Sequence, residues 1–276
     1  MKRILVTTDF SEKSKAAIRF AIKLSLHDNY ELTFYHVCNL LKPSIWTDQA
    51  FHAFEKGSLE KTKRKLTRFV TSIYKEIGAL PNKMQYKIAN ANDVTKSILD
   101  DATLNHYDYI CLSKNNEENF LVITGSIVSH LLKKSEIPLI IVPPNYKTGS
   151  IKSVLLATAL LNLGEEVKIS VEFAKSINAG LEILHLQGPE DFNLDPALMK
   201  QMIKGVTNYP VKIDFKNWDL ATPLFRNMQI AIEERSPSIL ILFTDQDKNF
   251  VEKLLFPSFT KAFIEKASIP LLIFKK

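Results

Sequence analysis

Hydrophobic residues along this chain gather in short continuous runs, and these runs alternate with longer stretches of amphipathic spacing. Residues 3–8 and 31–37 are apolar and rich in β-branched or aromatic side chains, which is typical of buried parallel strands. Residues 12–26, between them, place apolar side chains at helical spacing. In the first half, the same criteria predict strands at 3–8, 31–37, 84–89, 108–113 and 138–142, and helices at 12–26, 48–78, 93–104 and 126–135.

The second half of the chain shows the same alternation. It predicts strands at 152–158, 181–186, 211–216, 239–243 and 270–274, and helices at 164–177, 194–206, 222–235 and 258–267. Four strand–helix steps that close on a fifth strand indicate a parallel sheet with helices on both faces. The sequence therefore predicts an α/β fold in each half.

The two halves also resemble each other residue by residue. Residues 125–142 read GSIVSHLLKKSEIPLIIV and residues 257–274 read PSFTKAFIEKASIPLLIF, at an offset of 132 residues (257 − 125). Two further pairs of segments match in the same order along the two halves. KRILVTTDF matches KSVLLATAL at an offset of 150 (152 − 2), and ELTFYHV matches GLEILHL. Such a repeat indicates two copies of one domain. We predict domain 1 at 1–146 and domain 2 at 151–276, with the second copy shorter by 18 residues (150 − 132).

The bulk composition is that of a globular protein, with 46% hydrophobic and 24% charged residues. No run approaches the ~18–20 apolar residues that a membrane helix needs, and the N-terminus lacks the apolar region of a signal peptide. Cys38 and Cys111 lie in or beside apolar runs, so we expect buried free thiols in a reducing compartment. These features predict a cytoplasmic protein without a membrane partner.

The net charge of +6 is mild. Basic residues fall mostly along helical stretches such as 60–69, where a solvated helix face is the expected role. Nucleic-acid binding would require a dense basic stripe with aromatic residues or a reading motif, and the sequence has neither. We therefore do not expect a nucleic-acid partner.

Ligands of open parallel sheets bind at the carboxyl ends of the strands, where the strand order changes direction. Three segments are expected to converge there: Thr7–Asp9, Val37–Asn39 and Ser113–Ser126. Gly125 and Ser126 open a predicted helix, whose unpaired amides and dipole favour a phosphate, although Ser126 has the alternative role of an N-cap.

Two further side chains have open roles. Asp9 either hydrogen-bonds a ligand or satisfies amides of its own loop. His36 ends a predicted strand and His185 matches it in the second copy. Its recurrence favours a role in the fold over a ligand or acid–base role.

The sequence offers little for covalent or acid–base catalysis. It contains no metal-ligand spacing, no nucleophile elbow, no Gly-x4-Gly-Lys-[Ser/Thr] loop and no Gly-x-Gly-x2-Gly. Only 8 of 276 residues are glycine, which disfavours glycine-cradled phosphate sites. We expect no catalytic residues and no metal site.

These motifs together resemble a universal stress protein domain. The resemblance is carried by ILVTTDFSEKSKAAIRFAIKLS at 4–25, by ELTFYHV at 31–37, and by the closing glycine–serine, helix and IPLIIVP. The second copy makes the whole chain similar to tandem universal stress proteins. The resemblance implies five-stranded parallel domains of the Rossmann-like, adenine nucleotide α-hydrolase type. It also implies that strands 138–142 and 270–274 pair the domains as an internal pseudo-dimer; homodimer formation by two chains stays open.

Nucleotide-binding members of that family use the Asp after strand one at the adenine and backbone at the end of strand two. They hold phosphates with Gly-x2-Gly-x9-Gly-[Ser/Thr] after strand four. Here the first two glycine positions fall on Leu112 and Asn115, or on Ser113 if the loop is shortened. Glu117 and Glu118 would repel a polyphosphate. The candidate nucleotide pocket of domain 1 is therefore Thr8, Asp9, Val37, Ser113, Gly125 and Ser126.

The second copy departs further from the family pattern. Ala159 stands where Asp9 stands, and Pro257 replaces the glycine before Ser258. Thr244 and Asp247 occupy the first two glycine positions. We predict that domain 2 does not bind ATP in the family's manner. The cofactor prediction is no resident group, with ATP or another adenine nucleotide in domain 1 as the alternative.

Three functional classes remain at this point. The leading hypothesis is a non-catalytic stress-response binding or adaptor protein with a degenerate nucleotide site. The alternative is an ATP-binding switch or weak ATPase that uses domain 1 only. The third class is a different α/β enzyme, such as an electron-transfer flavoprotein or an ATP pyrophosphatase. A pyrophosphatase would need a Ser-Gly-Gly loop after the first strand, where this chain reads VTTDFSEKS.

Overall fold

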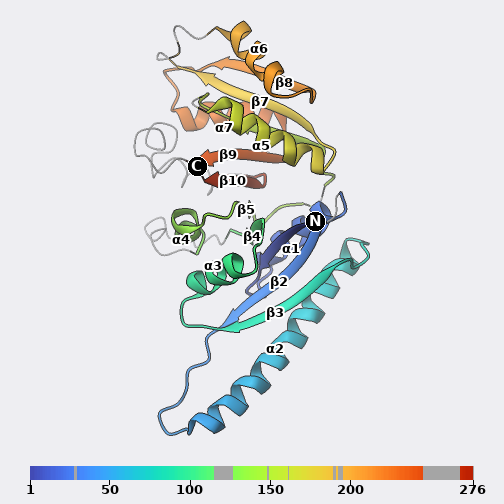
Figure 1. Ribbon diagram of the computed structural model, residues 1–276, viewed down its shortest axis with the longest axis vertical. Coiled ribbons are helices and arrows are strands. Elements are labelled where there is room, and N and C mark those ends of the chain that lie inside the picture. The colour runs from blue at the N-terminus through green and yellow to red at the C-terminus, as the bar shows by residue number, and fades with distance from the viewer. Residues whose placement is uncertain are drawn as a thin grey trace. The chain divides into compact units, whose positions relative to one another are not determined.

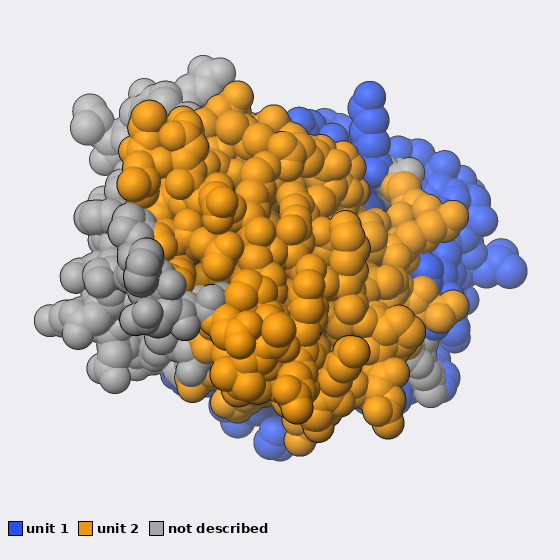
Figure 2. Space-filling model, turned by 90° about the horizontal axis from the view of Figure 1, so that it is seen from above, with its two compact units in different colours: residues 1–148 blue, residues 149–276 orange. Residues whose placement is uncertain are grey.

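The computed structural model describes most of the chain (Figure 1). The residues it describes are 1–27, 30–114, 127–147, 149–160, 162–188, 191, 195–244 and 268–275. The chain divides into two compact units, residues 1–148 and 149–276, which Figure 2 colours separately.

The described part of unit 1 alternates strands and helices along the chain. Its strands are β1 (Lys2–Thr7), β2 (Tyr30–Cys38), β3 (Met84–Asn90), β4 (Tyr109–Ser113) and β5 (Leu139–Val142). Its helices are α1 (Ser14–Ser25), α2 (Asp48–Glu76), α3 (Val94–Leu104) and α4 (Ile127–Lys134).

The strands of unit 1 follow the spatial order β3-β2-β1-β4-β5 and pair in parallel. The chain therefore moves outward from β1 to β3, then crosses back to β4 and moves the other way. Right-handed crossovers in opposite directions put their helices on opposite faces of the sheet. In agreement, α1 contacts α2, and α3 contacts α4. The change of direction lies between β1 and β4, which makes their carboxyl ends the expected ligand position.

Helix α1 packs closely on the centre of this sheet because its buried face is small. Ala16, Ala17 and Ala21 are fully buried beside the larger Phe20. The thiol of Cys111 on β4 lies 3.7 Å from the carbonyl oxygen of Ala17. Burial strongly raises the pKa of this thiol, so it stays protonated and acts as a small core residue.

Helix α2 is longer than the sheet that it covers. Its 29 residues span roughly 44 Å, whereas the nine residues of β2 span about 30 Å. Its buried side chains are Leu66, Val70, Ile73 and Tyr74, all in the second half of the helix. The first turns of the helix, before Glu55 meets Asn90 at the end of β3, extend past β2 and β3 of the same unit, as Figure 1 shows.

Unit 2 repeats this plan in its described residues. Its strands are β6 (Ser153–Ala157), β7 (Gly180–Gln187), β8 (Val211–Asn217), β9 (Ile239–Thr244) and β10 (Leu271–Lys275). Its helices are α5 (Leu163–Ser176), α6 (Pro196–Val206) and α7 (Leu224–Arg235). Within the unit the order is β10-β9-β6-β7-β8, again parallel, with β6 and β9 at the change of direction.

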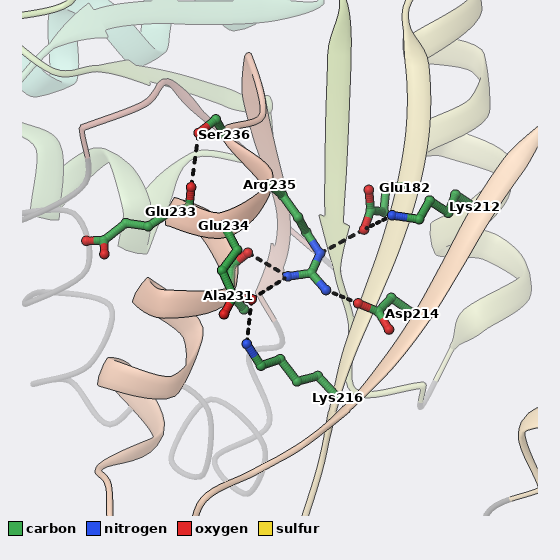
Figure 3. A network of polar contacts seen from close by, with 9 residues as sticks. All are labelled: Glu182, Lys212, Asp214, Lys216, Ala231, Glu233, Glu234, Arg235 and Ser236. Carbon is green, nitrogen blue, oxygen red and sulfur yellow. Dashed lines mark hydrogen bonds and ion pairs between the residues drawn. The ribbon is translucent and has the colours of Figure 1, made fainter.

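An ion-pair network fastens α7 to the outer strands of unit 2 (Figure 3). The guanidinium of Arg235 lies 2.7 Å from a carboxylate oxygen of Glu182 on β7 and also pairs with Asp214 on β8. Its third nitrogen donates to the Ala231 carbonyl at 2.7 Å. Lys212 adds a contact to Glu182 at 3.3 Å. Because the Arg235 side chain is only 12% exposed, this network holds α7 against the sheet of unit 2.

The structure confirms the α/β fold that the hydrophobic pattern predicted. Helix α1 begins at Ser14 rather than at residue 12, because the residues after β1 form a hydrogen-bonded turn first. Helix α6 begins at Pro196 rather than at 194, with Asp195 as its N-cap accepting from the Ala197 amide. The predicted helix 258–267 lies outside the described residues.

Candidate functional site

The first turn of the candidate site follows β1 and is built around Thr8. The Thr8 side chain is buried, and its hydroxyl lies 2.8 Å from the Ser14 hydroxyl. The same oxygen accepts from the Phe10 amide at 3.1 Å. Phe10 has φ 64°, the left-handed conformation that lets its amide turn back to Thr8. Thr8 therefore supports the turn.

Asp9 projects from this turn and is exposed. One of its carboxylate oxygens accepts from the Ser11 amide at 2.9 Å, which is an Asx turn. The Ser11 hydroxyl in turn accepts from the Ser14 amide at 3.1 Å, where α1 begins. Satisfying a loop amide is one of the two roles that the sequence left open for Asp9.

His36, at the end of β2, fastens the turn to the neighbouring strand. Its Nδ1 lies 2.7 Å from the Thr8 carbonyl oxygen; a carbonyl only accepts, so Nδ1 carries the hydrogen. The Phe10 ring packs against the imidazole at a centroid distance of 4.4 Å, and the Lys65 ammonium lies 4.4 Å from the Phe10 centroid. Burial lowers the pKa of His36 from 6.5; the Thr8 carbonyl and Asp9 oppose this shift, and the Lys65 charge adds to it.

Val37 is the next residue of β2, and its part-buried side chain follows His36 in the register with β3. It is thus placed at the carboxyl end of β2, as the sequence predicted. The structure brings Thr8, Asp9 and Val37 to neighbouring strand ends in this way.

The end of β4 supplies Ser113 and Lys114. The Ser113 hydroxyl donates to the Val142 carbonyl at 3.3 Å, and the Lys114 amide donates to the same oxygen at 3.0 Å. Lys114, a residue type that is usually exposed, is only 8% exposed here. Its position directly after an apolar strand was the signal for burial. Gly125 and Ser126 lie outside the described residues.

Unit 2 reproduces the same turn with different residues around it. Leu160 has φ 67°, and its amide donates to the Thr158 hydroxyl at 2.8 Å. His185 Nδ1 lies 2.9 Å from the Thr158 carbonyl. The hydroxyl of Thr244 at the end of β9 donates to the Phe274 carbonyl at 3.2 Å, as Ser113 does to Val142. These contacts agree with the prediction that the recurring histidine has a role in the fold.

The surroundings of the unit 2 turn are acidic. The buried Glu166 carboxylate accepts from the Thr158 hydroxyl. Asp191 brings a carboxylate oxygen to 3.1 Å from His185 Nε2, and the Gly188 amide donates to the same oxygen at 2.8 Å. Ala159 provides no carboxylate where unit 1 has Asp9. An anionic phosphate would meet two carboxylates near this turn.

Two classes of site find no support in the described part of the chain. There, no cluster of three or more His, Cys, Asp or Glu side chains is arranged to hold a metal ion. Likewise, no described helix has both the length and the apolar character to cross a membrane.

Comparison with known proteins identifies the family. A family profile described as the universal stress protein family matches residues 1–143, which is more than half of the chain. The chain belongs to the universal stress protein family. A search of curated proteins gives no match. The profile match ends before unit 2 begins.

Solved structures of this family extend the likeness to the whole chain. A universal stress protein from Archaeoglobus fulgidus is 17% identical, with a TM-score of 0.69, and the match covers 99% of this chain and 96% of that one. A putative universal stress protein from Pseudomonas aeruginosa is 12% identical with a TM-score of 0.59, covering 100% and 93%. A universal stress protein in complex with cAMP covers 52% of this chain and 97% of that one, at 15% identity and a TM-score of 0.38. At these identities the first two show the fold alone, and the third does not argue for a ligand here.

Proposed function

We propose that this universal stress protein is a non-catalytic stress-response binding or adaptor protein, cytoplasmic, whose nucleotide site in the first domain is degenerate. The observation that carries the proposal is that three of the candidate pocket side chains are already hydrogen-bonded within the protein. Thr8, Asp9 and Ser113 each make a hydrogen bond inside the protein. The contacts of Thr8 and Ser113 recur in unit 2 at Thr158 and Thr244. Because these side chains have the same structural role in both units, we attribute their contacts to the fold and not to a ligand site.

The loop after β4 supports the same conclusion from its sequence. Asn115 stands where the family has a glycine of the phosphate loop, and Leu112 or Ser113 stands where it has the other. A side chain at a position of close backbone approach or positive φ obstructs a bound phosphate. Glu117 and Glu118 add negative charge to this loop.

Native mass spectrometry of the full chain, before and after addition of ATP and Mg²⁺, tests this proposal. We expect the mass to be the same in both spectra. One adenine nucleotide retained per chain, and lost in Asp9→Ala, would instead identify a working site in domain 1.

The second candidate function is an ATP-binding switch or weak ATPase that uses domain 1 only. Two observations favour it: Asp9 is exposed at the change of strand direction, and the buried residue Lys114 follows β4 there. Titration calorimetry with ATP and Mg²⁺ tests it. A ligand at about 100 times its Kd would stabilise the protein by about 2.7 kcal/mol, so a thermal shift would accompany the heat.

The proposal includes unit 2 as a second, diverged universal stress protein domain, residues 151–276, after the first at 1–146. The equal strand order and the recurring threonine–histidine turn support it. We also propose that strands 138–142 and 270–274 pair the two domains. Each of these strands is apolar and stands last in the order of its own unit, and an apolar edge tends to be covered.

A further inference from the structure

The first half of α2 and the segment before it present apolar side chains to water. Ile45 is 89% exposed, Leu41 is 72% exposed and Phe54 is 45% exposed. We call Leu41, Ile45, Trp46, Phe51 and Phe54 the α2 tip. The tip comprises the first turns of α2 and the segment just before the helix, at the end of α2 that extends past the strands of unit 1 (Figure 1).

The α2 tip is held together by its own aromatic contacts. The ring of Trp46 meets the ring of Phe54 edge-on at a centroid distance of 5.1 Å, and Phe51 lies 6.4 Å from Phe54. Thr47 caps the helix by accepting from the Ala50 amide at 3.2 Å, which fixes Trp46 next to the first turn. An ordered, exposed cluster of large apolar side chains marks an interaction surface.

The charge around the α2 tip is strongly basic. Residues 40–68 contain seven Lys or Arg and three Asp or Glu, a net +4 (7 − 3) out of the +6 of the whole chain. Two of the three acids are engaged locally: Asp48 contacts Lys42 at 2.6 Å, and Glu55 accepts from the Asn90 amide group at 2.6 Å. Two-thirds of the net charge therefore lies on the α2 tip and on the stretch of α2 that follows it.

Helical spacing places the basic and apolar groups on a common flank. Lys61 lies seven residues after Phe54, and Lys65 and Arg68 follow at steps of four and three, so all four share one side of α2. All four side chains are exposed. The partner that fits this surface combines negative charge with an apolar layer just beneath it.

We propose that the α2 tip binds the surface of an anionic phospholipid bilayer, with Ile45, Trp46 and Phe54 entering the headgroup region and the flanking lysines and arginines contacting lipid phosphates. Lipid surfaces recruit segments with this combination of exposed apolar side chains and clustered basic residues. Tryptophan favours the interface between headgroups and acyl chains. The sequence expectation of no membrane partner rested on the lack of a spanning segment, which does not bear on a peripheral contact.

An acidic protein segment is the other class of anionic partner. The projecting position of the tip favours lipid, because a deformable bilayer accepts a protruding apolar cluster without a matching groove. A protein would need such a groove, shaped around Trp46 and Phe54.

Tryptophan fluorescence of the full chain tests the proposal. The chain has two tryptophans, so Trp218→Phe leaves Trp46 as the single reporter. We expect its emission to shift to the blue with vesicles of equimolar phosphatidylcholine and phosphatidylglycerol but not of phosphatidylcholine alone. Added salt should reverse the shift. Leu41→Ser with Ile45→Ser should weaken binding at least about tenfold.

Matched control variants distinguish binding by the α2 tip from nonspecific binding to vesicles. Leu80 and Leu104 are 84% and 77% exposed elsewhere in unit 1, so Leu80→Ser with Leu104→Ser should leave binding unchanged. Lys61→Ser with Arg68→Ser should weaken it roughly tenfold, whereas Lys133→Ser with Lys134→Ser, exposed on α4, should not.

Three results would overturn the assignment. The first is an unchanged Trp46 spectrum with anionic vesicles. The second is an equal loss in the control variants. The third is a spectral shift with polyglutamate but not with vesicles, which would identify an acidic protein as the partner.

Discussion

Unit 1 and unit 2 build the same turn after their first strands and surround it with different chemistry. In both, a threonine hydroxyl accepts from the amide two residues later and a histidine Nδ1 meets the threonine carbonyl. In unit 1 the histidine is part-buried against Phe10 near the Lys65 cation. In unit 2 it is 4% exposed and faces a carboxylate. The comparison separates what the fold requires, threonine and histidine, from what can vary, namely Asp9 or Ala159.

The largest expected effect comes from removing the buried histidine. His185→Ala should lower the stability of unit 2 by about 2–3 kcal/mol, because it leaves the Thr158 carbonyl without its imidazole donor and a cavity where a ring that is 4% exposed stood. His36→Ala should cost unit 1 only about 1 kcal/mol, since water reaches that side chain. Urea unfolding followed through Trp218 for unit 2 and Trp46 for unit 1, in single-tryptophan backgrounds, measures both. Equal costs would mean that burial does not separate the two turns.

A second comparison concerns the ion pairs that hold the helix after the third strand of each unit. Arg235→Ala should destabilise unit 2 by about 2 kcal/mol, because Glu182 and Asp214 lose a mostly buried guanidinium. Lys87 pairs with Asp101 in unit 1, but its side chain is 42% exposed. Water reaches the lysine, but the Asp101 carboxylate that it leaves behind is only 10% exposed, so Lys87→Ala should cost about 1–2 kcal/mol, measured by the same unfolding curves. Arg235→Lys serves as the control: if it restores full stability, the forked geometry does not matter.

The pH dependence of unit 1 should reflect His36. Its folded-state pKa is lowered from 6.5, chiefly by burial, so the folded state favours the neutral ring. The stabilisation is complete above pH 6.5 and falls as the pH drops from there through the lower folded-state pKa, because the unfolded chain takes up the proton first.

Urea midpoints reported by Trp46 between neutral pH and about pH 5 check this effect. In His36→Asn, which keeps a donor but does not titrate, the slope with pH should be smaller. An unchanged slope would assign the dependence to other groups.

The smallest expected effect is at the position that differs most between the turns. Asp9→Ala should cost about 0.5–1 kcal/mol, because it removes one exposed hydrogen bond to the Ser11 amide. Under the proposed function its response to ATP should match that of the unchanged chain in a thermal-shift assay. The reciprocal Ala159→Asp is the control and should not create an ATP response in unit 2.

The sequence alone determined the order of elements, the repeat and the fold class, because these depend on local periodicity. Runs such as residues 3–8 and 138–142 are apolar on both sides, and only a strand covered on both faces makes use of that pattern. Matching anchors in the same order then predicted two copies of one plan. The sequence also placed Thr8, Asp9, Val37 and Ser113 at strand ends.

Which side chains meet was decided only by the tertiary structure. His36 reaches the Thr8 carbonyl because β2 lies beside β1 in a particular register, and no local pattern specifies that register. The same holds for α2. Its helical pattern predicts one long helix, but the buried side chains Leu66, Val70, Ile73 and Tyr74 all lie in its second half, since the strands beneath it are shorter than the helix. Periodicity fixes which face of a helix is apolar, whereas the length of its neighbours decides how much of that face leaves water.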